Sequence, residues 1–405
     1  MIHNRIKRSL LLAALACCMS APLAATELVV WHAYRGAEKE AFQAVVDQFS
    51  KQSDGITVKT LAVPYDAYAD KITAAVPRGK GPDVFIFAQD RLGGWIEAGN
   101  TVEPIDFYVD DEMRARFLDR TLDALTYRDI VYGLPLNFKC IALIYNKKMI
   151  DAPPKTSSEL VALAKKHTNA AAGQYGLAYS YSDFFFHAAL MNGFGGGVFA
   201  PGPKPTLNRA ENVKSIELIL KWYKQDGIVP AEPSTALITS LFNKGKAAMI
   251  FNGPWFLGEI DSSIDYALAP LPTLDEAGGT PMKPWMTIEG VYVSAPSKNK
   301  DEAFDLVNYL TSLEAGKVMA LQGRQLPANK AVYAIDEVKK DPVMQAFVAQ
   351  SKVAVPMPNL AEMSMFWSPA TTAMNTIIRG TATPKAALDK AQVQVEKAVA
   401  KLRKQ

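Results

Sequence analysis

Short apolar segments alternate with segments of helical periodicity in the first part of the chain. Strands are predicted at residues 28–31, 56–63 and 84–88, because these runs are short, apolar and bounded by polar residues. Between them, apolar residues recur at helical spacing over 42–49 and 65–76. This order of strands and helices predicts an α/β fold, in which helices flank a parallel sheet.

The same alternation begins again near residue 135. A second series of strands and helices is predicted at residues 141–145, 157–166, 210–226, 247–251 and 266–269. A third series follows, with a strand at 290–294 and helices at 300–310, 313–321 and from 363 onward, broken near 381–384. Two α/β lobes are therefore expected, and ligands of such sheets bind at the carboxyl ends of the strands, here in a cleft between the lobes.

The N-terminal segment has the pattern of a secretory signal. A basic region at residues 5–8 precedes an apolar run at 10–16 and a stretch of small residues at 20–25. The apolar run is too short to span a bilayer, which takes about 20 residues. We expect residues 1–25 to be a signal peptide; a buried N-terminal helix and a lipid anchor at Cys17 are the alternatives.

Charge and cysteine content narrow the functional classes. The 44 basic and 41 acidic residues become equal in number once the signal, with its three basic residues, is removed. This balance argues against a nucleic-acid-binding protein, which carries a basic excess. Cys140 is the one cysteine after the signal, so no intramolecular disulfide is expected.

Residues with the chemistry of carbohydrate recognition follow the third predicted strand. Phe87 offers an apolar ring for the C–H face of a sugar, while Asp90 and Arg91 offer charged hydrogen-bonding groups for its hydroxyls. Asp90 could instead cap the following helix. Trp255 follows a proline at a predicted strand-to-helix junction, and Trp367 lies early in the terminal helical region, so both are candidates to face a cleft.

Four segments, in the same order along the chain, resemble the maltose/maltodextrin-binding proteins, which are extracellular solute-binding proteins of ABC sugar importers. The segments are Gly-Lys-Gly-Pro-Asp-Val-Phe-Ile-Phe-Ala-Gln-Asp-Arg-Leu-Gly-Gly at 79–94, Ala-Leu-Ile-Tyr-Asn-Lys at 142–147, Phe-Asn-Lys-Gly-Lys-Ala-Ala-Met-Ile-Phe-Asn-Gly-Pro-Trp at 242–255, and the pair at 357–360 and 363–367. The resemblance covers nearly all of residues 26–405. It implies a two-lobed periplasmic-binding-protein fold of type II, each lobe a mainly parallel sheet flanked by helices, with the ligand cleft between them.

The resemblance also implies roles for individual residues. Trp255 and Trp367 correspond to sugar-stacking rings, and Asp90 and Arg91 to groups that bind sugar hydroxyls. Phe87 stands in the place of a tryptophan. The remaining family positions are occupied by Tyr34, Arg35, Asp70, Asp183, Phe185 and Phe186.

Several positions depart from the family pattern. Lys139 replaces a glutamate, Ala69 replaces an acidic residue, and Ser368 and Thr371 stand where the family has a tyrosine and an arginine. Lys139 is predicted to contact the ligand, with a surface lysine as the alternative. Glu289, at a predicted crossing between lobes, is a candidate replacement contact, with a solvated turn residue as the alternative.

The predicted lobes each combine separate parts of the chain. The first lobe is expected to contain residues 26–137 and 291–336, and the second residues 141–285 and 343–405. Three crossings, at 138–140, 286–290 and 337–342, are expected to form the hinge.

The predicted function is that of a periplasmic binding protein that delivers a maltodextrin-like sugar to inner-membrane ABC permease subunits. A monomer is expected, with no cofactor, no metal and no nucleic-acid partner. The alternatives are another disaccharide such as trehalose or sucrose, a polyol, a glycerol phosphate ester, or an exported protein coupled to a chemoreceptor. An enzyme is not expected: Asp90, Asp183 and Glu289 could pair as glycosidase carboxylates, but the common nucleophile, metal and phosphate-loop motifs are missing.

Overall fold

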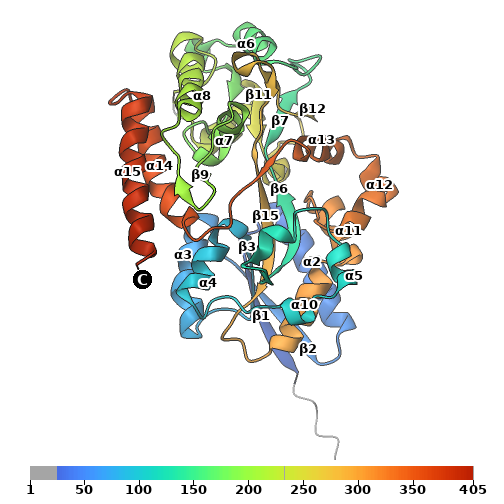
Figure 1. Cartoon of the computed structure of the whole chain (residues 1–405). Coiled ribbons are helices and arrows are strands. Elements are labelled where there is room, and N and C mark those ends of the chain that lie inside the picture. Colours follow the sequence, from blue (N-terminus) through green and yellow to red (C-terminus); the bar gives the residue numbers. More distant parts are fainter. Residues whose placement is uncertain (1–24, 232, 405) are drawn as a thin grey trace, which may run out of the picture.

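The computed structural model describes residues 25–231 and 233–404. The predicted signal peptide, apart from Ala25, and the alternative anchor Cys17 lie outside the described residues. Within them, two lobes lie one above the other, and a long central strand, β15, runs from one into the other (Figure 1).

The lower lobe in Figure 1 is built on a mixed sheet with the strand order β16-β15-β3-β1-β2, and β6 also pairs with β15. The strands are β1 (Thr26–His32), β2 (Ile56–Ala62), β3 (Val84–Ala88), β6 (Leu134–Lys139), β15 (Trp285–Val293) and β16 (Val355–Pro356). The three strands predicted in the first part of the chain are confirmed, and β1 is parallel to both β2 and β3. β15 runs antiparallel to β3 and β6.

Helices surround this sheet, including those that the apolar periodicity predicted over 42–49 and 65–76. They are α2 (Gly36–Gln52), α3 (Tyr65–Ala75), α4 (Leu92–Ala98), α5 (Asp111–Ala115), α10 (Lys300–Leu310), α11 (Leu313–Leu321) and α12 (Asp336–Lys339). Helix α2 buries Phe42, Val45, Val46 and Phe49, which recur at the spacing of one helix face. The predicted helices at 300–310 and 313–321 are confirmed.

The upper lobe contains a four-stranded sheet in the order β12-β7-β11-β8. Its strands are β7 (Ala142–Asn146), β8 (Tyr175–Ala178), β11 (Ala247–Asn252) and β12 (Tyr266–Ala269). Its helices are α6 (Ser157–Lys166), α7 (Phe184–Gly193), α8 (Ala210–Leu220), α9 (Thr235–Asn243) and α13 (Pro342–Ser351), and the predicted helix at 210–226 ends in a π-helical turn, Lys221–Gln225.

The second sheet is less parallel than expected. β11 is parallel to β8, but β7 is antiparallel to both β11 and β12. The sheet is mixed because β7 and β11 enter it from opposite ends. β7 begins only three residues after β6 and runs away from the junction, whereas β11 runs toward it and ends before Trp255.

The central strand β15 starts earlier than the strand predicted at 290–294. Trp285 and Met286 pair with β16, and the strand then continues between β3 and β6. Its register shifts between Glu289 and Gly290. A side chain at Gly290 would place a Cβ atom 2.5 Å from the ring of Tyr292, so this close approach requires glycine.

Two C-terminal helices, α14 (Met363–Ile378) and α15 (Pro384–Leu402), pack along the side of the second lobe (Figure 1). The predicted break falls between them, where the Thr383 side chain caps α15. Leu388 and Val395 belong to the same hydrophobic core as Trp222 of the second lobe. The Gln392 amide also accepts from the N–H of Leu207 and donates to the carbonyl of Pro205, both at 2.7 Å.

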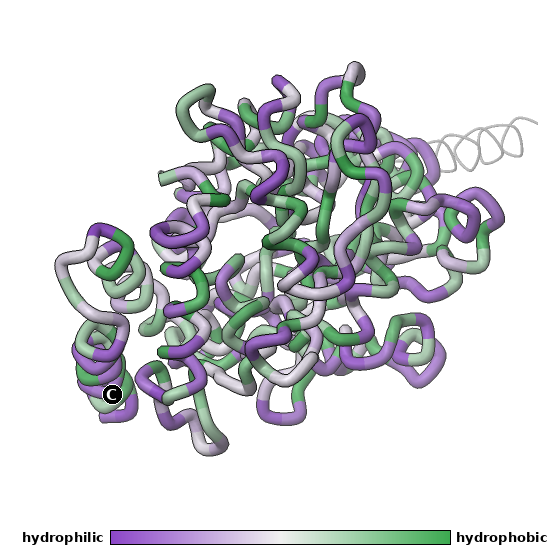
Figure 2. The backbone as a smooth tube through the Cα atoms, turned by 90° about the horizontal axis from the view of Figure 1, so that it is seen from above, coloured by the Kyte–Doolittle hydropathy of each residue, from purple (hydrophilic) through white to green (hydrophobic). Residues whose placement is uncertain are grey.

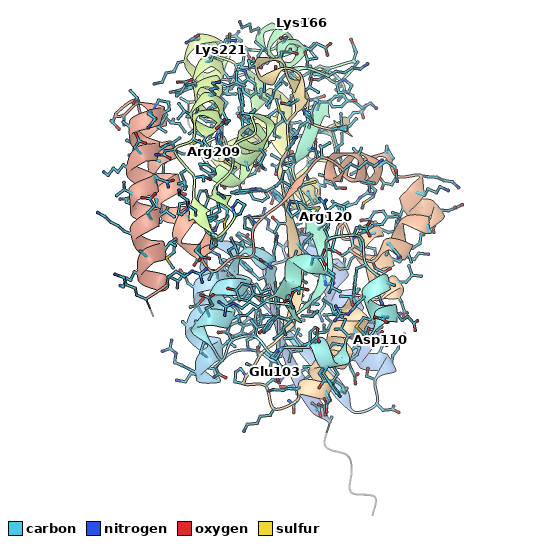
Figure 3. The ribbon with its side chains drawn as sticks, viewed as in Figure 1. Glu103, Asp110, Arg120, Lys166, Arg209 and Lys221 are labelled. Carbon is cyan, nitrogen blue, oxygen red and sulfur yellow. The ribbon has the colours of Figure 1, made fainter. Side chains whose placement is uncertain are left out.

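Hydrophobic and hydrophilic residues alternate along most of the backbone (Figure 2). Within residues 25–231 and 233–404, no helix combines the length and apolarity that crossing a membrane requires. Charged side chains such as Lys166 and Lys221 of the second lobe, and Glu103 and Asp110 of the first, lie at the periphery of the molecule, away from the junction (Figure 3).

Candidate functional site

A group of polar side chains from β6, β15 and the segment after β1 lies at the junction of the lobes. The Tyr34 hydroxyl donates a 2.6 Å hydrogen bond to Oε2 of Glu289, and Asn137 Nδ2 donates to the same oxygen at 3.1 Å. Lys139 Nζ lies 3.3 Å from the other oxygen of Glu289. The Glu289 side chain is only 13% exposed and lies within a strand, so the alternative of a solvated turn residue is wrong.

The same group extends to helix α2. Lys139 Nζ lies 3.6 Å from Oε1 of Glu38, and Gln325 Nε2 donates to that oxygen at 2.7 Å. Because Lys139 sits between two carboxylates and is 16% exposed, the alternative of a surface lysine is wrong. We call this set the junction network: Tyr34, Glu38, Asn137, Lys139, Glu289 and Gln325.

Electrostatics in the junction network follow from burial. Burial raises the pKa of the Tyr34 hydroxyl, and the carboxylate of Glu289 raises it further. Burial also raises the pKa of Glu38, against the opposing effect of Lys139. For Lys139, burial acts to lower the pKa, but Glu289 and Glu38 outweigh it and the pKa is raised. The lysine is therefore held in its charged form.

Asp90 lies in the 3₁₀ turn Gln89–Arg91 that follows β3, and it joins the first lobe to α14. Trp367 Nε1 donates a 3.1 Å hydrogen bond to Oδ2 of Asp90, and Nε of Arg91 lies 3.2 Å from the same oxygen. Burial raises the Asp90 pKa to about 6, although Arg91 and the Trp367 hydrogen bond oppose the shift. Helix α4 begins after Arg91 without a side-chain cap, so the capping role considered for Asp90 is wrong.

Phe87 is almost fully enclosed by other rings. Its ring stacks on Tyr65 with a centroid distance of 5.3 Å, and Tyr68 and Trp95 pack at 5.2 and 5.9 Å. Phe87 is 4% exposed whereas Tyr65 is 61% exposed. The accessible face of this aromatic group therefore belongs to Tyr65, which was not predicted from the sequence.

Tyr65 is accessible within the junction rather than on the outer surface. Although its ring is exposed, the protein that surrounds the hydroxyl removes much of its water and raises its pKa, and the carboxylates of Asp90, Glu289 and Asp183 add to the shift, against Arg91. Since Asp90 and Glu289 belong to the first lobe and Asp183 to the second, the Tyr65 hydroxyl lies among charged groups from both lobes. A tyrosine at the start of a helix is common, and only its position directly after Pro64 could have drawn attention to it.

Asp183 stands at the N-terminus of α7 and accepts a 2.9 Å hydrogen bond from the N–H of Phe185. Its side chain is exposed, but the surrounding protein removes enough water to raise its pKa, and Asp66 of helix α3 adds to the shift. Asp70 follows Asp66 by one helical turn and is exposed; no described residue forms an ion pair or a side-chain hydrogen bond with it. The structure thus brings Asp183, but not Asp70, into contact with other predicted residues.

Aromatic side chains of the second lobe form a continuous wall. Trp255 packs against Phe185 and Phe186, with ring centroids 5.9 and 6.4 Å apart. Phe185 lies 6.5 Å from Trp285, and Trp285 lies 5.7 Å from Trp367. We call these five residues the aromatic wall. Trp285 is buried and was not predicted; it links the two tryptophans that were, and both of these are half-buried.

At the Trp255 end, Arg35 of the first lobe reaches the second lobe. Its Nη2 lies 2.7 Å from Oε1 of Glu259, which belongs to the 3₁₀ segment Pro254–Glu259. A recess of about 130 Å³, open to solvent, lies between the lobes here and is lined by residues that include Arg35, Glu38, Trp255 and Glu259. The predicted residues Arg35 and Trp255 therefore share one cavity.

The arrangement suits a ligand with apolar faces and many hydroxyl groups. Aromatic rings pack well on C–H faces, and carboxylates and guanidinium groups bind hydroxyls in pairs. Among residues 25–231 and 233–404, no cluster of three or more histidine, cysteine, aspartate or glutamate side chains has the geometry to hold a metal ion.

Comparison with known proteins gives relatives over most of the chain. The maltotriose-binding protein of Pyrococcus abyssi is 30% identical over 360 residues, which cover 87% of this chain and 78% of that protein. The galactooligosaccharide-binding protein of Bacillus subtilis is 30% identical over 383 residues, covering 90% and 88%.

A solved structure agrees with the sequence relatives. The maltose/maltodextrin-binding domain of Bdellovibrio bacteriovorus, bound to maltotriose, superposes with a TM-score of 0.86 at 27% identity, covering 93% of this chain and all of that one. The expected type II, two-lobed fold is thereby confirmed. The family model described as bacterial extracellular solute-binding protein matches residues 35–317, and the chain belongs to this family.

Proposed function

We propose that this protein is the periplasmic substrate-binding subunit of an ABC importer and that it captures an uncharged, maltodextrin-like oligosaccharide. The observation that carries the proposal is the aromatic wall, which faces the charged pair Asp90 and Arg91 across the junction. The names of its relatives, which bind maltotriose and galactooligosaccharide, support a sugar of this kind. We propose a monomer that delivers its cargo to inner-membrane permease subunits and catalyses no reaction.

Closure of two lobes is the proposed mechanism. The predicted lobes, residues 26–137 with 291–336 and 141–285 with 343–405, would rotate about the crossings at 138–140, 286–290 and 337–342. β6 and β7 on either side of Cys140, and the continuous strand β15, support this division. A sugar that contacts both lobes at once binds the closed state better and shifts the population toward it.

The charge pattern favours a neutral sugar over a glycerol phosphate ester. A phosphate needs unpaired cations or backbone N–H groups, and each candidate cation already lies close to a carboxylate. The pairs are Arg35 with Glu259 at 2.7 Å, Arg91 with Asp90 at 3.2 Å, and Lys139 with Glu289 at 3.3 Å. Asp183 adds a further negative charge, so the cleft disfavours an anion.

A titration panel tests the proposal. Mature protein is titrated calorimetrically with maltose, maltotriose, a galactooligosaccharide, trehalose, sucrose, mannitol and glycerol 3-phosphate. We expect micromolar dissociation constants, about −8 kcal/mol, for the maltodextrins, with a parallel change in tryptophan fluorescence because Trp255 and Trp367 lie in the aromatic wall. Binding of the phosphate ester alone would overturn the neutral-sugar proposal, and hydrolysis products of any panel sugar would overturn the absence of catalysis.

A further inference from the structure

The ion pair between Arg35 and Glu259 spans the two lobes at the Trp255 end of the aromatic wall. Arg35 precedes helix α2 in the first lobe, and Glu259 ends the 3₁₀ segment that carries Trp255 in the second. Their charged groups meet at 2.7 Å, and both residues line the recess beside Trp255. The pair therefore forms part of the wall of the recess.

The backbones of the two lobes also come close at this point. A Cβ atom placed on Gly258 would lie 3.6 Å from the Cβ atom of Ala37 and 3.9 Å from its backbone nitrogen. This is ordinary van der Waals contact, so a residue with a side chain at position 258 would fill the remaining space. The segment next to the ion pair is thus closed by main chain as well as by charged side chains.

Glu259 is held in place from within the second lobe. Asn243 Nδ2 donates a 2.7 Å hydrogen bond to its carbonyl oxygen, and the Thr239 hydroxyl lies 3.4 Å from the carboxylate oxygen that does not bind Arg35. Arg35, in contrast, is held at its tip by Glu259 alone among the described residues. Removal of the Glu259 carboxylate would therefore release the guanidinium group without disturbing the first lobe.

We propose that Arg35 and Glu259 form a gate that closes the cleft at its Trp255 end and limits the length of the bound sugar. The proposal rests on the proposed function. A sugar unit stacked on Trp255 reaches the gate, and a further unit at that end would have to displace the ion pair. These two residues, rather than the stacking rings, then set the length of sugar that the protein prefers.

The free energy of the Arg35–Glu259 ion pair limits how strongly it can affect sugar binding. The side chains of Arg35 and Glu259 are 57% and 31% exposed, and exposed ion pairs contribute little free energy because water and salt screen them. Loss of the pair therefore changes the affinity for a short sugar by less than about fivefold. The same limit applies to displacement: a longer sugar that pushes the two side chains apart loses no more than the pair contributes, so the gate sets a length preference of at most about fivefold.

The test compares sugar lengths in the Glu259→Ala variant by calorimetric titration. Maltose, maltotriose, maltotetraose and maltoheptaose are titrated into wild type and variant. We expect the dissociation constants of maltose and maltotriose to change equally and by less than about fivefold, while that of maltoheptaose, relative to maltotriose, falls about three- to fivefold. The Asp265→Ala variant, which removes an exposed second-lobe ion pair with Lys147, is the matched control and should leave this ratio unchanged.

A charge reversal provides the second arm. Arg35→Glu combined with Glu259→Arg restores the ion pair and should return the length ratio toward that of the wild type. An equal change for all four sugars, no change for any, or wild-type binding of maltoheptaose as tight as that of maltotriose would overturn the gate and leave the proposed function standing. Failure of the wild type to bind any of the four sugars would overturn the proposed function as well.

Discussion

The two sides of the junction use their side chains in opposite ways. In the first lobe, Tyr34 and Lys139 each bind the carboxylate of Glu289. In the second lobe, Trp255 and Trp367 present half-buried rings supported from behind by other aromatic residues. Removal of one partner from the paired charges of the junction network lowers the stability of the fold. Removal of a ring from the aromatic wall mainly removes contact area for the ligand.

The largest expected effect is a loss of stability when a charge is removed from the junction network. Lys139→Met leaves Glu38 and Glu289 facing each other without a cation, and we expect the free energy of unfolding to fall by about 3 kcal/mol, because breaking a largely buried ion pair exposes an uncompensated charge. Urea denaturation followed by circular dichroism measures the change. Lys340→Met, which breaks the exposed pair with Asp336, should cost less than about 1 kcal/mol. Equal losses in both variants would contradict the coupling of the junction network.

The next effect concerns the aromatic side. We expect Trp255→Ala and Trp367→Ala each to weaken binding of the panel sugar that binds best by about 1–3 kcal/mol, without loss of cooperative unfolding. Trp255→Phe keeps an aromatic face at the same place and serves as the control, with a smaller loss. Calorimetric titration gives the affinities. Unchanged titration curves for both alanine variants would remove stacking from the proposed mechanism.

The smallest effect concerns Asp90 of the first lobe, which binds Trp367 of the aromatic wall. Its pKa is raised from 3.8 to about 6, so the folded protein binds this proton more tightly than the unfolded chain does. The stability contribution of this group is therefore fully present below about pH 4 and is lost as the pH rises through 6. Asp90→Asn removes this loss.

Because the Asp90→Asn variant also leaves Arg91 without its carboxylate, we expect only about 1–2 kcal/mol of added stability at pH 7.5, less than the pKa shift alone corresponds to. Melting temperatures without sugar, from pH 4 to 8, test this expectation. The wild-type curve should fall relative to that of the variant between pH 4 and 6. Asp70→Asn, at an exposed position, should run parallel to the wild type, and a parallel Asp90→Asn curve would show that the buried carboxylate does not govern this region.

Local sequence patterns predicted the elements but not the contacts between them. The strands around Val30 and Ile86 and the break between α14 and α15 are visible in apolar periodicity and in proline placement. The N-terminal half of β15 was missed because Glu289 and Gly290 interrupt the apolar run and read as a turn. Only pairing with β16, β6 and β3 makes this segment a strand.

The candidate site was predictable to the extent that the resemblance marks positions. Trp255, Trp367, Asp90 and Arg91 were identified in this way, and the structure brings Asp90 into contact with both Arg91 and Trp367. Glu259 was not predicted, because its partner lies 224 positions away and nothing in the local sequence distinguishes it from other surface glutamates.

The packing of α14 and α15 on the second lobe has a consequence for the timing of folding. This lobe starts near residue 141, yet Leu388 and Val395 belong to its core. At a synthesis rate of about 5–20 residues per second, roughly 10–50 seconds separate the first residue of the lobe from the last that its core needs. Throughout that interval the nascent second lobe has an incomplete core, so the full chain has to be made before this half of the protein reaches its stable form.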